Sequence, residues 1–572
     1  MVQLEELLNV LKEEHSRMKT NRLGIPIIFL ICLGSVLLLS VEIQEKYVVE
    51  PIDPVEETIE YHPPELFLNE DKSVYDQDSD GYVDIFEVTV YPPDDIYHDL
   101  GYINTNINYI AGSYSEDTLD PQARITLQID GIDYEGTLEL RGQSSRLLDQ
   151  KSYKIKLFDD VNAFKGMRVL NLNKHYKDNF RIRNKLAYDV LEEMDNLIGL
   201  RTRFVRLYIT EGGKRSDFGL FTLVEQPNKA FLSSHGLDAD GQLYKAEFFE
   251  FLRYDGVLEA SSSPLYSEEN FNQHLEVREN PDHDKLVYLL ESINDPKNNI
   301  NDVITHHFSR ENILSYVAIN TLLDNYDSNS RNYLLYSPAY SHIWYFVLWD
   351  LDKTMREEEK EHWSFGVSNY WGVELFNRFF RDPDNVNLLV ERVEEIYASF
   401  TPDKMTSRLE TYAPIIQTHM IESVDYGYFK DDILDSRHRH PDLNTLEDFW
   451  DKYYELAYLP TENRERFYRN LEKPYPYFIH FEQDETARFS WDLSFDMQGD
   501  AVTYTLLIAS DAAMTDILYE ETTGELSIEL NTLPEGSRYY TIKATDEHGN
   551  QQLPFNQTLY DGTIYRGVEV ID

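Results

Sequence analysis

The sequence predicts an α+β protein that is preceded by one membrane-spanning helix and followed by an all-β sandwich. Three observations carry this expectation. An uncharged apolar run lies near the N-terminus, strand-like alternation gives way to helical spacing along the chain, and period-two alternation returns at the end. With 572 residues, of which 42% are hydrophobic and 13% aromatic, the chain is too apolar to be disordered and has material for a large core.

The first element is the apolar run LGIPIIFLICLGSVLLLSV at 23–41, which meets the length of a membrane-spanning helix. Basic side chains precede it and acidic ones follow it, so the positive-inside rule places 1–22 in the cytoplasm and the remainder outside the cell. A cleaved signal peptide and a buried core helix are the alternatives, but no small-x-small cleavage site follows the run. We expect a single-pass signal anchor.

The net charge of −51 belongs to the extracellular part, because 1–22 carries equal numbers of acidic and basic side chains. This excess argues against nucleic acid as a partner and against adhesion to anionic lipid surfaces. It would steer the protein towards basic partners. The single cysteine, Cys32, excludes an intramolecular disulfide and a cysteine zinc site. A large extracellular chain without disulfides is typical of a bacterial surface rather than a eukaryotic one.

The remaining elements follow in order. Residues 42–70 are rich in Pro and Glu and predict an extended stalk. Strands are expected within 85–160 and at 204–210 and 218–226, helices at 180–198 and 311–324, short strands at 333–336 and 343–349, a surface loop at 255–275, and mostly helix from 372 to 470.

Residues 474–572 alternate with period two between turn residues, which predicts a β-sandwich. Trp491, Tyr504 and Tyr540 stand where a fibronectin type III-like module places core aromatics. The resulting domain boundaries are a stalk at 42–70, a loop region at 71–90, a main domain at 91–472 and the sandwich at 473–572.

The sequence DQDSDGYVDIFE at 76–87 has the spacing of a calcium loop. Oxygen ligands at positions 1, 3, 5, 7, 9 and 12 wrap around one Ca²⁺, and a glycine at position 6 allows the sharp turn. A strand-like stretch follows, so the loop resembles the single calcium loops of dockerin or thrombospondin type 3 modules more than a paired EF-hand. The alternative is an acidic turn in the stalk. The predicted Ca²⁺ ligands are Asp76, Asp78, Asp80, Tyr82, Asp84 and Glu87.

A second motif joins the 311–324 helix to two short strands. Asp327 and Asn332 are five residues apart in the first loop, and Asp350 and Asp352 follow the second strand. This is the order of the protein-kinase catalytic loop and the metal-binding Asp after it. The spacing is compatible with phosphoryl transfer, in which one carboxylate orients the attacking hydroxyl and the other oxygens hold magnesium. Ordinary turns also favour Asp and Asn.

Several stretches together are similar to the signature of the spore-coat-protein-H (CotH) kinase family. They occur in the family's order within residues 85–400. The resemblance implies a divergent protein-kinase-like, two-lobed domain that transfers phosphate from ATP to serines of coat or surface proteins. The stretches are 139–158, 178–191, 204–209, 217–226, 324–336 and 344–354.

The resemblance implies that Asp327 is the catalytic residue and that Asn332 and Asp350 bind Mg²⁺ or Mn²⁺, with Asp352 in the same turn. It leaves the nucleotide contacts open. Glycine, hydroxyls and arginines at 141–146 suit a phosphate loop, and either Lys151 or Lys154 is a candidate for neutralising the phosphates, with Glu192 or Glu193 as its partner. The nucleotide-binding candidates are Arg141, Ser144, Ser145, Arg146, Lys151, Lys154, Glu192 and Glu225.

We therefore expect a membrane-anchored extracytoplasmic Ser/Thr kinase that uses ATP and Mg²⁺ and carries Ca²⁺. Its acceptor would be a basic, serine-containing protein of the cell or spore surface. The alternatives are a non-catalytic kinase-like scaffold or adhesion protein, and transfer of a nucleotide in place of a phosphate.

Overall fold

The computed structural model describes residues 70–77, 81–105, 120–142, 144–158, 163–176, 178–355, 365–426, 445–484 and 486–571. All of them belong to one compact unit, Pro64–Asp572. Within these ranges, no helix has both the length and the apolar character that crossing a membrane requires. The predicted tail, anchor and nearly all of the stalk, at 1–22, 23–41 and 42–70, lie outside the described residues.

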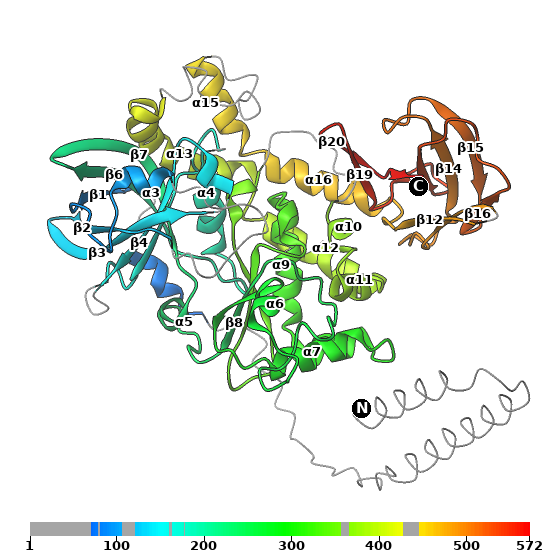
Figure 1. Ribbon diagram of the computed structural model, residues 1–572, viewed down its shortest axis with the longest axis horizontal. Coiled ribbons are helices and arrows are strands. Elements are labelled where there is room, and N and C mark those ends of the chain that lie inside the picture. The colour runs from blue at the N-terminus through cyan, green and yellow to red at the C-terminus, as the bar shows by residue number, and fades with distance from the viewer. Residues whose placement is uncertain are drawn as a thin grey trace, which may run out of the picture. The chain divides into compact units, whose positions relative to one another are not determined.

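The first part of the described chain is a closed barrel with the strand order β1-β2-β3-β4-β5-β7-β6 (Figure 1). Neighbouring strands are antiparallel except for β1 and β6. Alternate apolar side chains such as Ile125, Leu127 and Ile155 fill the interior, as the period-two pattern predicts. The strands are β1 (Val83–Val90), β2 (Ala123–Ile129), β3 (Ile132–Arg141), β4 (Ser152–Leu157), β5 (Val169–Asn173), β6 (Thr202–Glu211) and β7 (Lys214–Glu225).

The helix predicted at 180–198 is shorter in the structure, where α4 spans Arg183–Leu191. The Asp178 carboxylate accepts a hydrogen bond from the Arg183 backbone N–H and fixes the start of the helix. After Glu192, the N–H groups of Glu193 and Met194 bond three residues back, as in a 3-10 turn. The rest of the predicted helix is therefore turn structure.

The second part contains an antiparallel sheet with the order β11-β10-β8-β9. Strands β10 and β11 are the two short strands that the sequence predicts. Strands β8 and β9 are not predicted by the sequence pattern, because a long polar connection separates them. The strands are β8 (Gln242–Ala246), β9 (Leu275–Glu279), β10 (Tyr333–Ser337) and β11 (Tyr345–Leu348).

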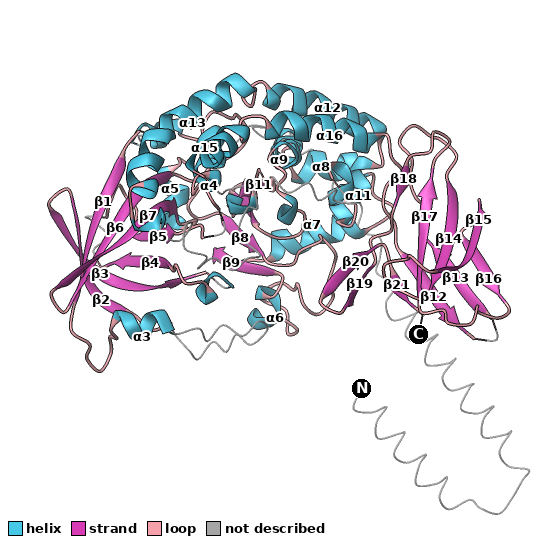
Figure 2. Cartoon of the chain, turned by 90° about the horizontal axis from the view of Figure 1, so that it is seen from above, coloured by secondary structure: helices cyan, strands magenta, loops and turns pink. Residues whose placement is uncertain are grey.

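Helices surround this sheet, and α9 packs against β11, α12 and α16 (Figure 2). Helices α9, α12 and α15 are each preceded by an N-cap residue whose side chain accepts a hydrogen bond from a backbone N–H of the first turn. These residues are Ser309, Asp382 and Thr445. The helices of the barrel and this part are α3 (Leu100–Thr105), α5 (Lys229–Ser234), α6 (Glu268–Asn272), α7 (Asp284–Asn294), α8 (Ile300–His307), α9 (Arg310–Leu322), α10 (Val367–Tyr370), α11 (Glu374–Phe380), α12 (Pro383–Tyr397), α13 (Pro402–Ile416), α15 (Leu446–Glu455) and α16 (Leu459–Leu471).

The C-terminal module is all β, as predicted, and two sheets enclose its core (Figure 2). Trp491, Tyr504 and Tyr540 are buried between the sheets, which confirms their core positions. Together with the mixed region before it, the module confirms the α+β class. The strands are β12 (Ile479–Gln483), β13 (Ala487–Trp491), β14 (Thr503–Ala509), β15 (Ile517–Thr523), β16 (Ser527–Leu530), β17 (Tyr539–Thr545), β18 (Gln551–Gln552), β19 (Gln557–Tyr560), β20 (Thr563–Arg566) and β21 (Glu569–Val570).

Candidate functional site

The hairpin of β10 and β11 brings the predicted catalytic and metal-binding positions together. Tyr333 pairs with Leu348, so Asn332 and Asp350 lie at the open end of the hairpin. Asp327 lies in a 3-10 turn that follows α9. These residues and Asp352 line one cavity of about 610 Å³. The structure thus gathers side chains that the sequence places in separate loops.

The backbone at both hairpin positions is left-handed, with φ of 58° at Asn332 and 61° at Asp350. Asn and Asp tolerate this conformation better than most residues, although it is still unfavourable. Strained backbone of this kind clusters at functional sites, where the surrounding structure maintains it. The conformation therefore agrees with a specific role for both side chains.

Asp327 is buried, and its carboxylate has two basic neighbours. The Lys353 Nζ donates to Oδ2 at 2.6 Å, and the Arg331 Nη2 lies 3.4 Å from Oδ1. Burial alone would lower the pKa of Lys353, but the hydrogen bond and charge of Asp327 raise it. Lys353 therefore stays charged, and it is half exposed to the cavity beside the candidate catalytic carboxylate.

Asp350 and Asp352 form an acidic pair, and no described cation makes an ion pair with either carboxylate, although Arg141, Lys245 and Lys353 lie near enough to act on Asp350. Burial raises the pKa of Asp350, and Arg141 and Lys245 only partly oppose it. Burial and then the charge of Asp350 raise the pKa of Asp352 well above its usual range. No described residue donates a hydrogen bond to either carboxylate. With the Asn332 amide oxygen nearby in the cavity, this all-oxygen donor set fits a hard divalent cation such as Mg²⁺ or Mn²⁺.

The barrel contributes Arg141 and the loop after it to the same cavity. The Arg141 guanidinium donates to Asn173 Oδ1 at 2.7 Å and to Asn171 Oδ1 at 3.0 Å, and it lies 5.6 Å from the Trp349 ring centroid. Burial lowers its pKa to about 10, so it remains a cation at neutral pH. The Gly142 backbone has φ of 90°, and a Cβ there would meet the Ser145 Oγ at 1.9 Å. Arg141, Gly142 and Ser145 of the predicted phosphate loop therefore line the main cavity.

Four cations that line the cavity are absent from the sequence prediction: Arg331 and Lys353 beside Asp327, and Lys245 and Arg278 on the second sheet. Lys245 of β8 pairs with Glu247, and Arg278 of β9 donates to Glu276 at 2.7 Å. The Arg278 Nε is buried and has no hydrogen-bond partner among the described residues. Alternation in QLYKA is the signal that a strand prediction at 242–246 would have used. The second sheet thus adds a lysine to the cavity, whereas Lys151 and Lys154 of the barrel side do not line it.

Apart from Arg141, the predicted cations of the barrel and its loop lie elsewhere. Arg146 makes a two-pronged pair with Asp120, at 2.5 and 2.6 Å, and braces the loop. Lys151 donates to the Arg146 carbonyl at 2.6 Å and lines a separate cavity of about 300 Å³. Lys154 pairs with Glu139, its direct cross-strand neighbour, on the outside of the barrel. The side chain of Ser144 is outside the described residues.

The predicted acidic partners also lie away from the main cavity. Glu192 follows α4, and Glu193 pairs with Arg408. Glu225 is buried between Arg201 and His235, with its carboxylate 2.8 Å from the His235 Nε2. These carboxylates have structural partners, so the structure does not place them against a nucleotide.

The predicted calcium loop is described only in its second half. Asp76, Asp78 and Asp80 have no described side chain, and Tyr82 is exposed. Asp84 and Glu87 lie on β1, three residues apart, and so face opposite sides of the strand. Asp84 is buried against the Arg203 Nε at 2.5 Å, and Glu87 pairs with Arg215 at 2.6 Å. The structure does not bring these two together, and the barrel begins at Val83, before the predicted boundary at residue 91.

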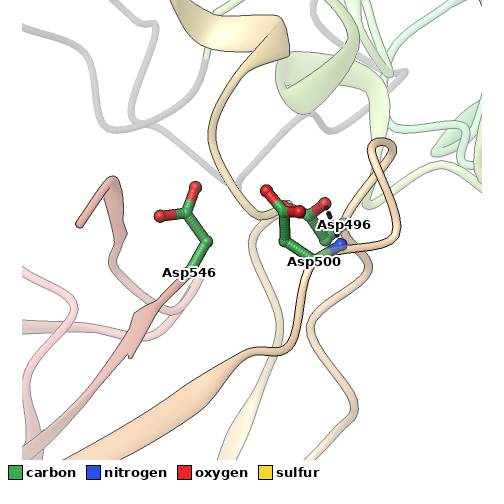
Figure 3. Close-up of side chains that lie close together, drawn as sticks. All are labelled: Asp496, Asp500 and Asp546. Atoms are coloured by element: carbon green, nitrogen blue, oxygen red, sulfur yellow. Dashed lines mark hydrogen bonds between the residues drawn. The ribbon is translucent and has the colours of Figure 1, made fainter. Parts of the chain in front are cut away.

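Another acidic group lies in the C-terminal module, where carboxylate oxygens of Asp496, Asp500 and Asp546 are within 4.8 Å of one another (Figure 3). Asp546 accepts hydrogen bonds from the backbone N–H groups of His548 and Asn550. Asp496 accepts one from the N–H of Asp500. These bonds shape two tight turns, and we interpret the group as turn structure.

Comparison with known proteins agrees with this geometry. The family described as "CotH kinase protein" matches residues 138–455, which include the whole cavity. The chain is also 25% identical over 240 residues to the inner spore coat protein H of Bacillus subtilis (strain 168). That match covers 41% of this chain and 63% of the spore coat protein.

A barrel and a helix-covered sheet share one cavity that carboxylates and cations line, within an α+β domain. The family match spans more than half of the chain. The protein belongs to the CotH kinase protein family.

Proposed function

We propose that this protein is a membrane-anchored, extracytoplasmic protein kinase that transfers the γ-phosphate of ATP to Ser or Thr of a surface or spore-coat protein. The observation that carries the proposal is the convergence of Asp327, Asn332, Asp350 and Asp352 on one cavity. Membership of the CotH kinase protein family supports the same reaction class.

Each cavity residue has a role in this proposal. Asp350, Asp352 and Asn332 would hold the divalent cation, which when bound would neutralise charge on the phosphate oxygens. Asp327 would orient the acceptor hydroxyl and accept its proton. Lys353, which already contacts the Asp327 carboxylate, would hold the transferred phosphoryl group next to that hydroxyl.

The remaining cations suit the triphosphate. Arg141 approaches from the barrel, and Lys245 and Arg278 approach from the β8–β9 side of the second sheet. Charge-assisted hydrogen bonds to phosphate are stronger than neutral ones, and arginine binds phosphate in a two-pronged manner. Lys245 and Arg278 replace Lys151 and Lys154 as proposed phosphate contacts beside the predicted Arg141, because Lys151 and Lys154 do not line the cavity.

The site's setting is part of the proposal. The apolar run at 23–41 would anchor the chain, and the relative in Bacillus subtilis is a spore coat protein. The acidic composition favours a basic acceptor that contains serine, because opposite charge steers encounter between proteins. A scaffold that keeps this fold without catalysis is the outcome if no transfer is found.

The experiment is incubation of the full chain with γ-labelled ATP and Mg²⁺ or Mn²⁺, scored by labelling of the chain and of a basic acceptor protein. Asp350→Asn keeps a residue type that tolerates the left-handed backbone while it removes the charge, so labelling should fall by at least a hundredfold. Asp130→Asn is the matched control, since Asp130 also has positive φ, at 51°, but lies in the exposed β2–β3 turn. Equal labelling by the wild type and Asp350→Asn would refute the proposed site.

Calcium binding remains a separate proposal for the loop at 76–87. Loss of Asp78 should then abolish any calcium-dependent rise in melting temperature. Loss of Asp84 should lower stability with or without calcium, because Arg203 loses its buried partner. A melting temperature that calcium does not change in the wild type would remove calcium from the proposal.

A further inference from the structure

A short segment, residues 366–371, lies between the catalytic loop and the C-terminal module. It contains α10, and Gly366 at its start has φ of 57°. A Cβ at Gly366 would meet the Phe467 ring of α16 at 2.7 Å, so the segment enters in close contact with that helix. We call residues 366–371 the bridging segment.

On one side, the bridging segment holds both neighbours of Asp327. The Asn369 Nδ2 donates to the Tyr326 carbonyl at 3.2 Å, and the Tyr370 hydroxyl lies 3.1 Å from the Ser328 Oγ. The Asn329 Nδ2 in turn donates to the Asn369 carbonyl at 3.1 Å. The residues before and after the candidate catalytic carboxylate are therefore both attached to the same segment.

The last residue of the bridging segment, Trp371, contacts the C-terminal module. Trp371 is buried, with its ring centroid 4.4 Å from that of Tyr475 and 5.7 Å from that of Phe495. Phe495 and Phe555 pack against the large core to which Trp371 belongs. Aromatic pairs of this kind contribute beyond the area they bury. Trp371 is thus held by side chains that precede and follow the first strand of the module.

The module is also fixed to the end of α16, which leads into it (Figure 1). The Gln498 Nε2 donates to the Leu471 carbonyl at 2.9 Å, and the Asn550 Nδ2 donates to the Glu472 carbonyl at 3.0 Å. Two loops of the module therefore seat on one helix end, next to the aromatic contact with Trp371. The module has a defined position against the bridging segment.

We propose that Trp371 is a positioning residue through which the C-terminal module holds the catalytic loop in place. The path is short: the module contacts Trp371, Tyr370 and Asn369 precede it, and their hydrogen bonds reach the residues on either side of Asp327. The β-sandwich is then part of the catalytic unit rather than an independent binding module. The catalytic consequence rests on the proposed kinase function, whereas the positioning of the loop does not.

The test compares Trp371→Ala and Trp371→Phe in the full chain. Trp371→Ala should lower the turnover of labelling by about tenfold while the nucleotide dissociation constant stays near the wild-type value, because the cavity cations and acidic pair are untouched. Trp371→Phe keeps an aromatic ring against Tyr475 and should restore most of the turnover. Phe478→Ala is the control, since Phe478 is a half-exposed aromatic of the same module that contacts Phe555.

Hydrogen–deuterium exchange at 325–332 gives a readout that needs no catalysis. Exchange there should rise in Trp371→Ala and stay unchanged in Phe478→Ala. If the wild type does not label but exchange responds in this way, the kinase proposal fails and the positioning stands. If Trp371→Ala unfolds the protein, Asn369→Ala tests the same path by removing the bond to Tyr326. Wild-type exchange and turnover in the folded variants would overturn the proposal.

Discussion

The carboxylates that are buried in the barrel and those that line the cavity differ in their partners. Glu225 in the barrel lies between Arg201 and His235, and although burial alone would raise its pKa, these partners lower it. Asp350 and Asp352 in the cavity have raised pKa values. A buried charge is tolerated when it is paired. Glu225 is therefore a carboxylate that stabilises the fold, whereas Asp350 and Asp352 are the proposed ligands of a cation.

The largest expected effect comes from breaking a pair in the barrel. Arg201→Met leaves Glu225 with one fewer cation in a buried setting, so the free energy of unfolding should fall by about 3–5 kcal/mol. Denaturant unfolding of the full chain measures it. Lys229→Met is the control, because Lys229 makes its ion pair with Asp240 at the surface and its loss should have little effect. Similar losses in both variants would contradict the distinction between the two regions.

A smaller effect should appear as a pH dependence at His235. Burial alone would lower the pKa of His235, but the hydrogen bonds to Glu225 and Glu70 raise it above the usual 6.5. A raised folded-state pKa means that this stabilisation is complete below about pH 6.5 and is lost as the pH rises through the folded value. The effect is smaller than that of Arg201→Met because Arg201 remains on Glu225.

Unfolding free energies of the wild type and His235→Gln, measured between about pH 5.5 and 9, should therefore differ most at the acid end and converge at the alkaline end. Tyr75, Lys72 and Arg201 also face this cluster. Parallel curves for the two proteins would exclude His235 as the source of the pH dependence.

The carboxylate half of the site was predictable from sequence because its geometry is local. Asp327, Asn332 and Asp350 are joined by one loop and one hairpin, and a hairpin fixes which residues meet at its open end. The cations were not predictable in this way. Alternation places Lys154 on the outer face of β4, but it does not reveal that Glu139 lies directly opposite on β3. Register between strands is a tertiary property.

The fold shows the same limit. Strand β6 was predicted to within two residues of its ends, but the first four residues of β7 were missed. The period-two pattern of 474–572 identified the C-terminal module. The closure of the barrel was not predicted, because the parallel pairing of β1 with β6 joins residues far apart in sequence. Strands β8 and β9 were missed because a long polar connection separates them, and so Lys245 and Arg278, which these strands carry, were missed too.

Lys245 in the cavity and Lys154 on the outside of the barrel should differ in their effect on nucleotide binding. Lys245→Met should weaken binding of a non-hydrolysable ATP analogue by about tenfold to a hundredfold, because a charge-assisted bond to phosphate contributes roughly 1.5–3 kcal/mol. Lys154→Met is the matched control and should bind as the wild type does, since its partner is Glu139 outside the cavity. Calorimetric titration measures both. If only Lys154→Met binds the analogue more weakly, the phosphate contact is Lys154 of the barrel and not Lys245.

The smallest expected effect is a gain in stability when Asp352 is replaced by Asn. Asp352 is half-buried in the cavity beside Asp350, and desolvation and then the charge of Asp350 raise its pKa, which disfavours the charged form. Asp352→Asn removes that repulsion, so in buffer containing EDTA the variant should be more stable than the wild type by about 1 kcal/mol. With Mg²⁺ and the ATP analogue, the wild type should gain stability by ligand binding and the variant should gain less. Thermal unfolding under both conditions checks the two signs together, with Asp130→Asn expected to match the wild type in each. A variant that is less stable than the wild type in EDTA would mean that Asp352 has a structural partner, and the cavity would then resemble the barrel.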